Sequence, residues 1–258
     1  MLPFVEIMGK RLPMYGICIM LGIFAAALFM LYDCKKNNVR WENAVIVGII
    51  GVISGFIGAK FLYILVTYTP SELIAILKEG DIAELTKGGF VFYGGLIAGV
   101  IGSWVGAVFL KGKLREYENV LVKIIPLVHA FGRMGCFFAG CCYGKPTESP
   151  IHVVFKEPLS NAPTGMPLIP VQLYEAGFNM ILFLVLWVLD RKCKRRLLLP
   201  VYITAYGMER FIIEFLRFDE IRGIFFGLST SQWISIGMCV VGVMLFLFRK
   251  AQAVEKSR

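Results

Sequence analysis

Long apolar blocks are the feature of this sequence that most constrains its fold. A helix needs about 20 apolar residues to cross a bilayer. Seven blocks of about this length lie near 13–32, 43–68, 90–110, 120–141, 171–190, 198–216 and 231–248. Over the whole chain 57% of the residues are hydrophobic and only 17% are charged. We therefore predict an all-α integral membrane protein, a bundle of seven transmembrane helices with a small extracytoplasmic loop region, forming one polytopic membrane domain over residues 1–258.

Lysine and arginine are unevenly distributed between the loops. They are dense after the first, third and fifth blocks and in the C-terminal tail, and sparse elsewhere. The positive-inside rule then places the N-terminus outside and the C-terminus in the cytoplasm, with the long loops 69–88 and 144–170 facing outward. The net charge of +9 reflects topology and contact with lipid headgroups, so we expect no nucleic-acid partner.

The sixth block carries ionisable residues, which are costly inside a membrane and therefore candidates for function. One helical face, with spacings of four, four and three, holds Tyr206, Arg210, Glu214 and Arg217. An internal Arg–Glu pair that holds helices together is one explanation. The face has two arginines for one glutamate, however, and the surplus charge favours an anion such as a lipid phosphate. Glu209 is expected to point elsewhere.

The fourth block also carries an arginine, on a second helical face. His129, Arg133, Cys136 and Gly140 share one helical face there. The two arginine-bearing faces could converge on one phosphate. Glu175, in the PVQLYEA segment that opens the fifth block, lies within plausible reach.

Tyrosines and glycines near the ends of other blocks complete the candidates. Tyr15, in LPMYG, is also explained by an interfacial aromatic belt. Gly94 and Gly95 lie beside Tyr93 in GGFVFYGGLIAG, where glycines allow close approach of another helix or of a ligand. Lys60 is expected to extend its amine to the membrane interface.

Three cysteines follow Arg133 in the segment GRMGCFFAGCCYG, residues 132–144. Cys136, Cys141 and Cys142 could bind a metal together with His129, provided that the helix breaks near Gly140. Cys136 could instead form a disulfide with Cys141 or Cys142, or one thiol could carry a lipid covalently. Small apolar packing beside the arginine is the interpretation that we favour.

Six segments in register carry a resemblance to a known family. They are MYG at 14–16, GGFVFYGGLIAG at 88–99, GRMG at 132–135, YGKPT at 143–147, PVQLYEA at 170–176 and YGMERFIIEFLR at 206–217. Taken together, they resemble the prolipoprotein diacylglyceryl transferases.

The resemblance implies an enzyme of the bacterial cytoplasmic (inner) membrane. It would transfer the diacylglyceryl group of phosphatidylglycerol to the lipobox cysteine of a prolipoprotein signal peptide, releasing glycerol phosphate, with no cofactor and no metal. The resemblance implies catalytic roles for Tyr93, Arg210 and Glu214. It implies contacts to phosphatidylglycerol for Arg133, Tyr15, Gly94, Gly95, Gly144 and Glu175.

The cysteines are where the sequence departs from the family pattern. The usual motif has an asparagine and an acidic residue where this chain has Cys136 and Cys141. Two alternatives follow: a diverged branch that acts on another lipid or acceptor, or a membrane thiol oxidoreductase that uses Cys136 and the Cys141/Cys142 pair.

Overall fold

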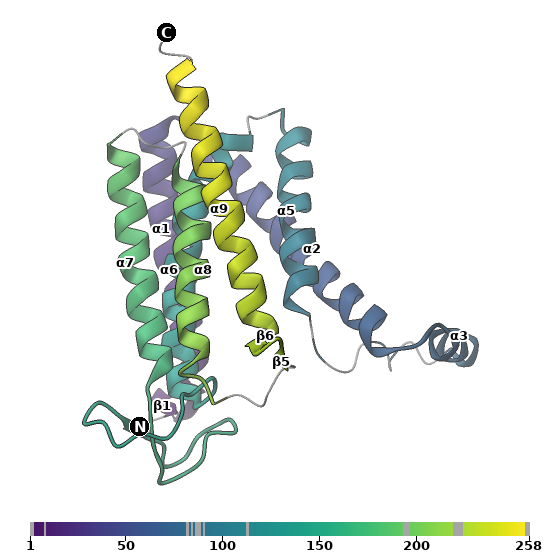
Figure 1. The fold of residues 1–258 in the computed structure, drawn as a ribbon, viewed down its shortest axis with the longest axis vertical. Helices are drawn as coiled ribbons and strands as arrows, with labels where there is room; N and C mark the ends of the chain where they lie inside the picture. The colour runs from purple at the N-terminus through teal and green to yellow at the C-terminus, as the bar shows by residue number, and fades with distance from the viewer. Residues whose placement is uncertain are drawn as a thin grey trace. The chain divides into compact units, whose positions relative to one another are not determined.

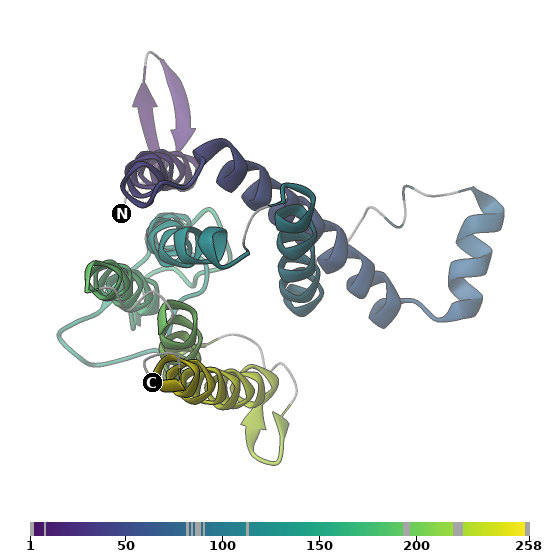
Figure 2. The same cartoon turned by 90° about the horizontal axis from the view of Figure 1, so that it is seen from above.

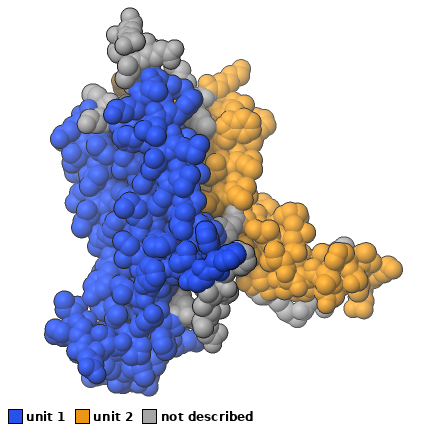
Figure 3. Space-filling view, viewed as in Figure 1, with its two compact units in different colours: residues 1–31, 122–258 blue, residues 32–121 orange. Residues whose placement is uncertain are grey.

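The computed structural model describes two compact units. The described residues are 3–7, 9–80, 83, 85, 89, 91–111, 114–192, 197–218 and 224–255. Unit 1 comprises residues 1–31 and 122–258, and unit 2 comprises residues 32–121 (Figure 3). The boundaries fall inside α1 (Met14–Asn37) and α6 (Leu114–Ala139).

Most of the described residues are helical. Among the described residues, five helices are long and apolar enough to cross a membrane: α1, α2 (Trp41–Thr67), α6, α7 (Val171–Arg191) and α9 (Thr230–Glu255). The prediction of a helical membrane protein is confirmed. The apolar part of α5 (Phe92–Phe109) is shorter, and α8 (Leu198–Glu214) is a 17-residue helix that carries charged side chains. The seven-span count stays a prediction.

Unit 2 is built on α2 and α5, which lie side by side (Figures 1 and 2). Glycines allow this close approach. A Cβ atom on Gly55 would lie 3.2 Å from the carbonyl oxygen of Gly95, and one on Gly99 would lie 3.2 Å from that of Gly51. Small residues at such positions are typical of helix packing in membranes.

The loop predicted at 69–88 contains a short helix, α3 (Pro70–Glu79). Thr69 and Glu72 form a capping box, in which the backbone N–H of Thr69 donates to Glu72 Oε2 at 2.7 Å. These hydrogen bonds hold the pKa of the exposed Glu72 carboxyl below its ordinary value. Gly80 ends the helix with a left-handed φ of 72°.

Unit 1 begins with a hairpin that the sequence did not predict. Strands β1 (Phe4–Ile7) and β2 (Lys10–Pro13) pair antiparallel, with Val5 opposite Leu12 and Gly9 in the turn. Later in the chain α8 packs against both α7 and α9. A second hairpin joins β5 (Ile224–Phe225) to β6 (Leu228–Ser229), directly before α9.

A folded loop region over residues 140–170 lies at the end of the bundle where α6 ends and α7 begins (Figure 1). Its small core is formed by Phe155, Ala162 and Leu168. Strands β3 (Val153–Val154) and β4 (Pro167–Leu168) pair antiparallel across it.

One buried ion pair joins α6 to α7. Lys123 Nζ lies 2.7 Å from Asp190 Oδ2, and the two side chains are 0% and 1% exposed. A pair this deeply buried is expensive to form, and removal of one partner leaves an uncompensated charge.

Candidate functional site

Arg133, near the end of α6, is held between two neighbours. Its Nε donates to His129 Nε2 at 3.1 Å, one helical turn earlier. The same nitrogen lies 3.0 Å from Glu175 Oε2 at the start of α7. The Glu175 side chain is 1% exposed and that of Arg133 is 15% exposed. His129 and Arg133, which were predicted to share one helical face, are therefore hydrogen-bonded to each other, and Glu175 from the next helix pairs with Arg133.

Arg210, on α8, is held in a similar way. Its Nη2 lies 2.7 Å from Glu214 Oε2 and donates to Ser231 Oγ at 3.2 Å. Ser229 caps α9 by accepting a hydrogen bond from the backbone N–H of Gln232, and its hydroxyl donates to Glu214 Oε1 at 2.9 Å. Within the described residues the Nη1 atom of Arg210 has no hydrogen-bond partner. The internal Arg–Glu pair exists, and it leaves Nη1 of Arg210 as a buried donor without a hydrogen-bond partner among the described residues.

Arg217 follows α8 and lies in a backbone bridge with Gly144. Gly144 also donates its N–H to the carbonyl of Ile169 at 3.0 Å. A Cβ atom on Gly144 would lie 2.7 Å from that carbonyl oxygen and 2.6 Å from a methyl group of Val171. Glycine at this position lets the segment after the cysteines pass between α7 and the end of α8.

The three arginines converge. Glu175 and Glu209 each lie within electrostatic reach of Arg133, Arg210 and Arg217. We call Arg133, Arg210, Arg217, Glu175, Glu209 and Glu214 the arginine cluster. The two arginine-bearing faces proposed from the sequence thus meet in unit 1.

Glu209 is the residue that the sequence interpretation missed. We expected it to point away from the site, but it is 6% exposed and lies within reach of the arginines. Neither carboxylate oxygen has a hydrogen-bond partner among the described residues. Because α8 packs against α7 on one side and α9 on another, a residue beside the arginine face is also buried. The signal that could have revealed Glu209 in the sequence is an acidic residue inside an apolar block, which is by itself a candidate for function.

Tyr15, in the first turn of α1, belongs to the surroundings of the arginine cluster. It packs over Gly135, where a Cβ atom would lie 3.1 Å from the tyrosine ring. Its hydroxyl is within electrostatic reach of Arg133 and of Cys136. The side chain is 41% exposed, so it stands at the open side of the site.

The predicted residues Tyr93, Gly94 and Gly95 belong to unit 2. The side chain of Tyr93 lies outside the described part of the structure. A Cβ atom on Gly94 would clash with the backbone of Gly58, and one on Gly95 would lie 3.2 Å from Ala59 Cβ. These two glycines therefore serve the packing of α5 on α2, and a contact of either with a lipid stays a prediction.

The three cysteines after Arg133 come together. Their Sγ atoms all lie within 4.8 Å of one another. The helix α6 ends at Ala139, and Gly140 adopts a left-handed φ of 72°. The break that a shared site would require is therefore present, and Cys136, Cys141 and Cys142 are all free thiols.

These features define a helical membrane protein with a partly buried cluster of arginines and carboxylates at one end of its bundle, beside three free thiols. The profile of the prolipoprotein diacylglyceryl transferase family matches residues 3–248. A phosphatidylglycerol–prolipoprotein diacylglyceryl transferase of Clostridium tetani is 36% identical over 248 residues, which cover 93% of this chain and 94% of the relative. A second such transferase, from Clostridium perfringens, is 35% identical over 95% of this chain and 94% of its own length. A relative of the same name from Dehalococcoides mccartyi is 28% identical over 95% of this chain and 92% of its own length.

The chain belongs to the prolipoprotein diacylglyceryl transferase family. The family resemblance inferred from the sequence segments is thus confirmed.

Proposed function

We propose that this protein transfers the diacylglyceryl group of phosphatidylglycerol to the lipobox cysteine thiol of a prolipoprotein signal peptide. The observation that carries the proposal is the convergence of Arg133, Arg210 and Arg217 in one partly buried cluster. The names of the relatives, all phosphatidylglycerol–prolipoprotein diacylglyceryl transferases, agree with it.

The chemistry explains why such a site needs clustered arginines. The acceptor sulfur attacks the glyceryl carbon, the bond from that carbon to the phosphate oxygen breaks, and glycerol phosphate leaves with an additional negative charge. Cations fixed where that charge develops stabilise the transition state more than the ground state. Arg210, whose buried Nη1 has no hydrogen-bond partner among the described residues, and Arg133 are the groups that we assign to the phosphate. Glu214 orients Arg210.

Glu175 and Tyr15 are assigned supporting roles. Glu175 fixes Arg133 from α7 at 3.0 Å. The exposed ring of Tyr15 offers an amphipathic surface to lipid at the edge of the site. On the basis of the family resemblance we also propose a contact of Gly144 with phosphatidylglycerol and a catalytic role for Tyr93.

The test is an assay of the purified full chain with phosphatidylglycerol vesicles and a synthetic lipobox peptide. Mass spectrometry should detect a peptide that has gained one diacylglyceryl group, together with free glycerol phosphate. A peptide with serine in place of the lipobox cysteine is the control and should gain nothing. Failure of the cysteine peptide to gain mass, under conditions in which another family member modifies it, would overturn the assigned substrates.

We further propose a seven-span topology in the inner membrane, with the N-terminus outside and the C-terminus in the cytoplasm. The distribution of Lys and Arg supports it. Alkaline phosphatase inserted at the exposed Gly165 should be active, and green fluorescent protein fused after residue 258 should be fluorescent in cells. The reverse pair of results would invert the topology.

A further inference from the structure

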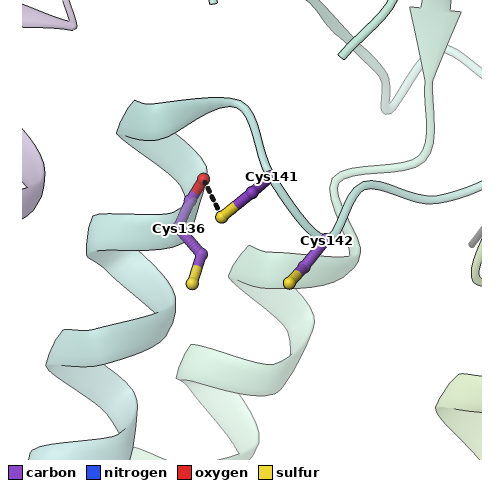
Figure 4. Close-up of side chains that lie close together, drawn as sticks. All are labelled: Cys136, Cys141 and Cys142. Carbon is purple, nitrogen blue, oxygen red and sulfur yellow. Dashed lines mark hydrogen bonds between the residues drawn. The ribbon is translucent and has the colours of Figure 1, made fainter. Parts of the chain in front are cut away.

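The cysteine site, which we define as Cys136, Cys141 and Cys142, depends on an unusual turn of the chain. On a continuous helix, residues five apart point about 140° away from each other. Here Gly140 and Cys142 both have left-handed φ angles, 72° and 56°. For Cys142, which is not a glycine, this backbone conformation is disfavoured. The result is that the three sulfur atoms turn toward one common space between the end of α6 and the turn that follows (Figure 4).

Hydrogen bonds hold this turn in place. The backbone N–H of Cys141 donates to the carbonyl of Cys136 at 3.1 Å. The buried Gln172 at the start of α7 donates from Nε2 to the carbonyl of Cys141 at 2.7 Å. Three residues after Cys142, Lys145 donates its N–H to the carbonyl of Leu216 at 2.8 Å. The sulfurs are therefore positioned by three segments of the chain.

Positive charge lies close to the cysteine site. Arg133 and Arg217 are within electrostatic reach of Cys142, which favours a negatively charged group there. Thiolate is the form that binds metal ions. All three cysteines are only partly buried, so an ion can reach them.

We propose that these three cysteines bind one thiophilic divalent ion of the zinc type. Thiolates are the ligands that such ions prefer. With Zn–S bonds of about 2.3 Å in tetrahedral geometry, the sulfurs of one site lie about 3.8 Å apart. The three Sγ atoms are already within 4.8 Å of one another, so shifts of about 1 Å or less close the site. No metal was expected from the family resemblance, and this site would replace that expectation.

Three protein ligands leave a tetrahedral ion with one open position. Among the described residues no further histidine, cysteine or acid joins the group of three. His129, which we had considered as a fourth ligand, instead accepts the hydrogen bond of Arg133 through Nε2. A zinc ion with three protein ligands and an open position is the arrangement of catalytic sites, in which the fourth ligand is water or substrate.

If the proposed function holds, an ion held by Cys136, Cys141 and Cys142 would offer its open position to the lipobox thiol and would favour the thiolate form of that thiol. Glu209, whose carboxylate oxygens have no hydrogen-bond partner among the described residues, is the group that we assign to take up the proton and pass it to water. In the transfer the acceptor sulfur bonds to the glyceryl carbon, the bond from that carbon to the phosphate oxygen breaks, and the electron pair leaves on the oxygen of glycerol phosphate, whose charge the arginine cluster would stabilise.

Metal binding can be tested without any activity. The purified full chain, reduced and freed of metal with a chelator, is titrated with Co²⁺, whose visible spectrum reports thiolate ligation. We expect one Co²⁺ per chain, with sulfur-to-cobalt charge-transfer absorption, displaced by Zn²⁺. Each of Cys136→Ser, Cys141→Ser and Cys142→Ser should weaken binding at least about tenfold, because each removes a direct ligand and loss of an outer-shell partner alone costs about 10–100-fold. Cys239→Ser, whose thiol donates to the carbonyl of Thr204 in α8, is the matched control and should bind Co²⁺ as the parent does.

Two outcomes would overturn the site. One is a reduced chain that binds no more Co²⁺ than the triple serine variant. The other is thiol titration of the protein as purified that finds two of the three cysteines joined in a disulfide, which would instead support the redox interpretation.

A second arm tests the open position and separates this inference from the proposed function. Adding the lipobox peptide to the Co²⁺-loaded protein should intensify the charge-transfer absorption, whereas the serine peptide should leave it unchanged. A chain that binds Co²⁺ but modifies no peptide would keep the metal site and reject the proposed function. A metal-free chain that still modifies the peptide at the full rate would reject a role of the ion in the reaction and keep the proposed function.

Discussion

Replacing one member of the Lys123–Asp190 pair should destabilise the protein far more than replacing both. The two charges lie 2.7 Å apart and are almost fully buried. At an effective dielectric constant of about 20, their attraction is about 6 kcal/mol. Desolvation costs several kcal/mol for each ion, so the intact pair is close to neutral relative to a well-packed apolar pair. Removing one partner leaves the other charged and buried, which costs about 3–5 kcal/mol.

We therefore expect Lys123→Met and Asp190→Leu each to lower the free energy of unfolding by about 3–5 kcal/mol. The double variant should stay within about 1 kcal/mol of the parent, because no unpaired charge remains. Reversible unfolding in mixed detergent micelles, followed by tryptophan fluorescence, measures all three variants. Lys250→Met, on the exposed end of α9, is the control and should change stability by less than about 0.5 kcal/mol.

A double variant that loses the sum of the two single effects would refute this reasoning. Such a result would mean that each side chain stabilises the fold through separate contacts. The outcome also bears on the site, because Lys123 and Arg133 both lie on α6, about 15 Å apart along the helix axis. Their partners Asp190 and Glu175 both lie on α7. Two ion pairs at two levels fix the position of α6 against α7, and therefore that of Arg133.

Three further outcomes are expected. Arg210→Ala should lower kcat/KM for phosphatidylglycerol at least about a hundredfold, because a donor that stabilises the developing charge is lost. Lys60, whose amine lies over the Tyr63 ring, is the control, and Lys60→Ala should change kcat/KM less than about twofold. Equal effects of the two substitutions would contradict the assigned site. Gly144→Ala should lower the free energy of unfolding by about 1–3 kcal/mol, because the added methyl group overpacks the site. Gly177→Ala, which adds a methyl group in open space, is the control and should not destabilise its helix. If both variants unfold with the same free energy, the structure around residue 144 has shifted to make room for the methyl group. Glu209→Gln should lower kcat by about a hundredfold. In a plot of kcat against pH, the variant should also lose the rise of activity that accompanies ionisation of a catalytic base. A plot with the same shape as that of the parent would rule out proton uptake by Glu209.

The helices and the arginine-bearing faces were predictable because each depends on a local pattern. Apolar length alone predicts a spanning helix, and both ends of α2 and α7 lie close to those of the predicted blocks. The helices α1, α6 and α9 each extend beyond one end of their block, where charged residues continue the helix. The spacing of Arg210 and Glu214 predicts an i,i+4 pair, which the structure contains. These signals require no knowledge of how the helices pack.

What the sequence could not predict depends on packing between helices. The burial of Glu209 follows from α7 and α9 packing on different sides of α8, and no spacing within α8 reveals that. For Gly94 and Gly95 the sequence left two explanations open: the close approach of another helix or that of a ligand. Only the contact with α2 shows that both glycines serve the packing of helices.

Charge balance in the arginine cluster connects proton transfer to phosphate release. With every group ionised, three arginines face three carboxylates, Glu175, Glu209 and Glu214, and the cluster offers an incoming phosphodiester little net attraction. A carboxylate buried without hydrogen-bond donors holds its charge at high cost, so Glu209 is the member best suited to accept a proton. If it takes up the proton of the acceptor thiol, as we propose, the cluster gains one net positive charge. The transfer that creates the attacking thiolate would then also strengthen the hold on the phosphate, at the moment when the departing glycerol phosphate gains its second negative charge.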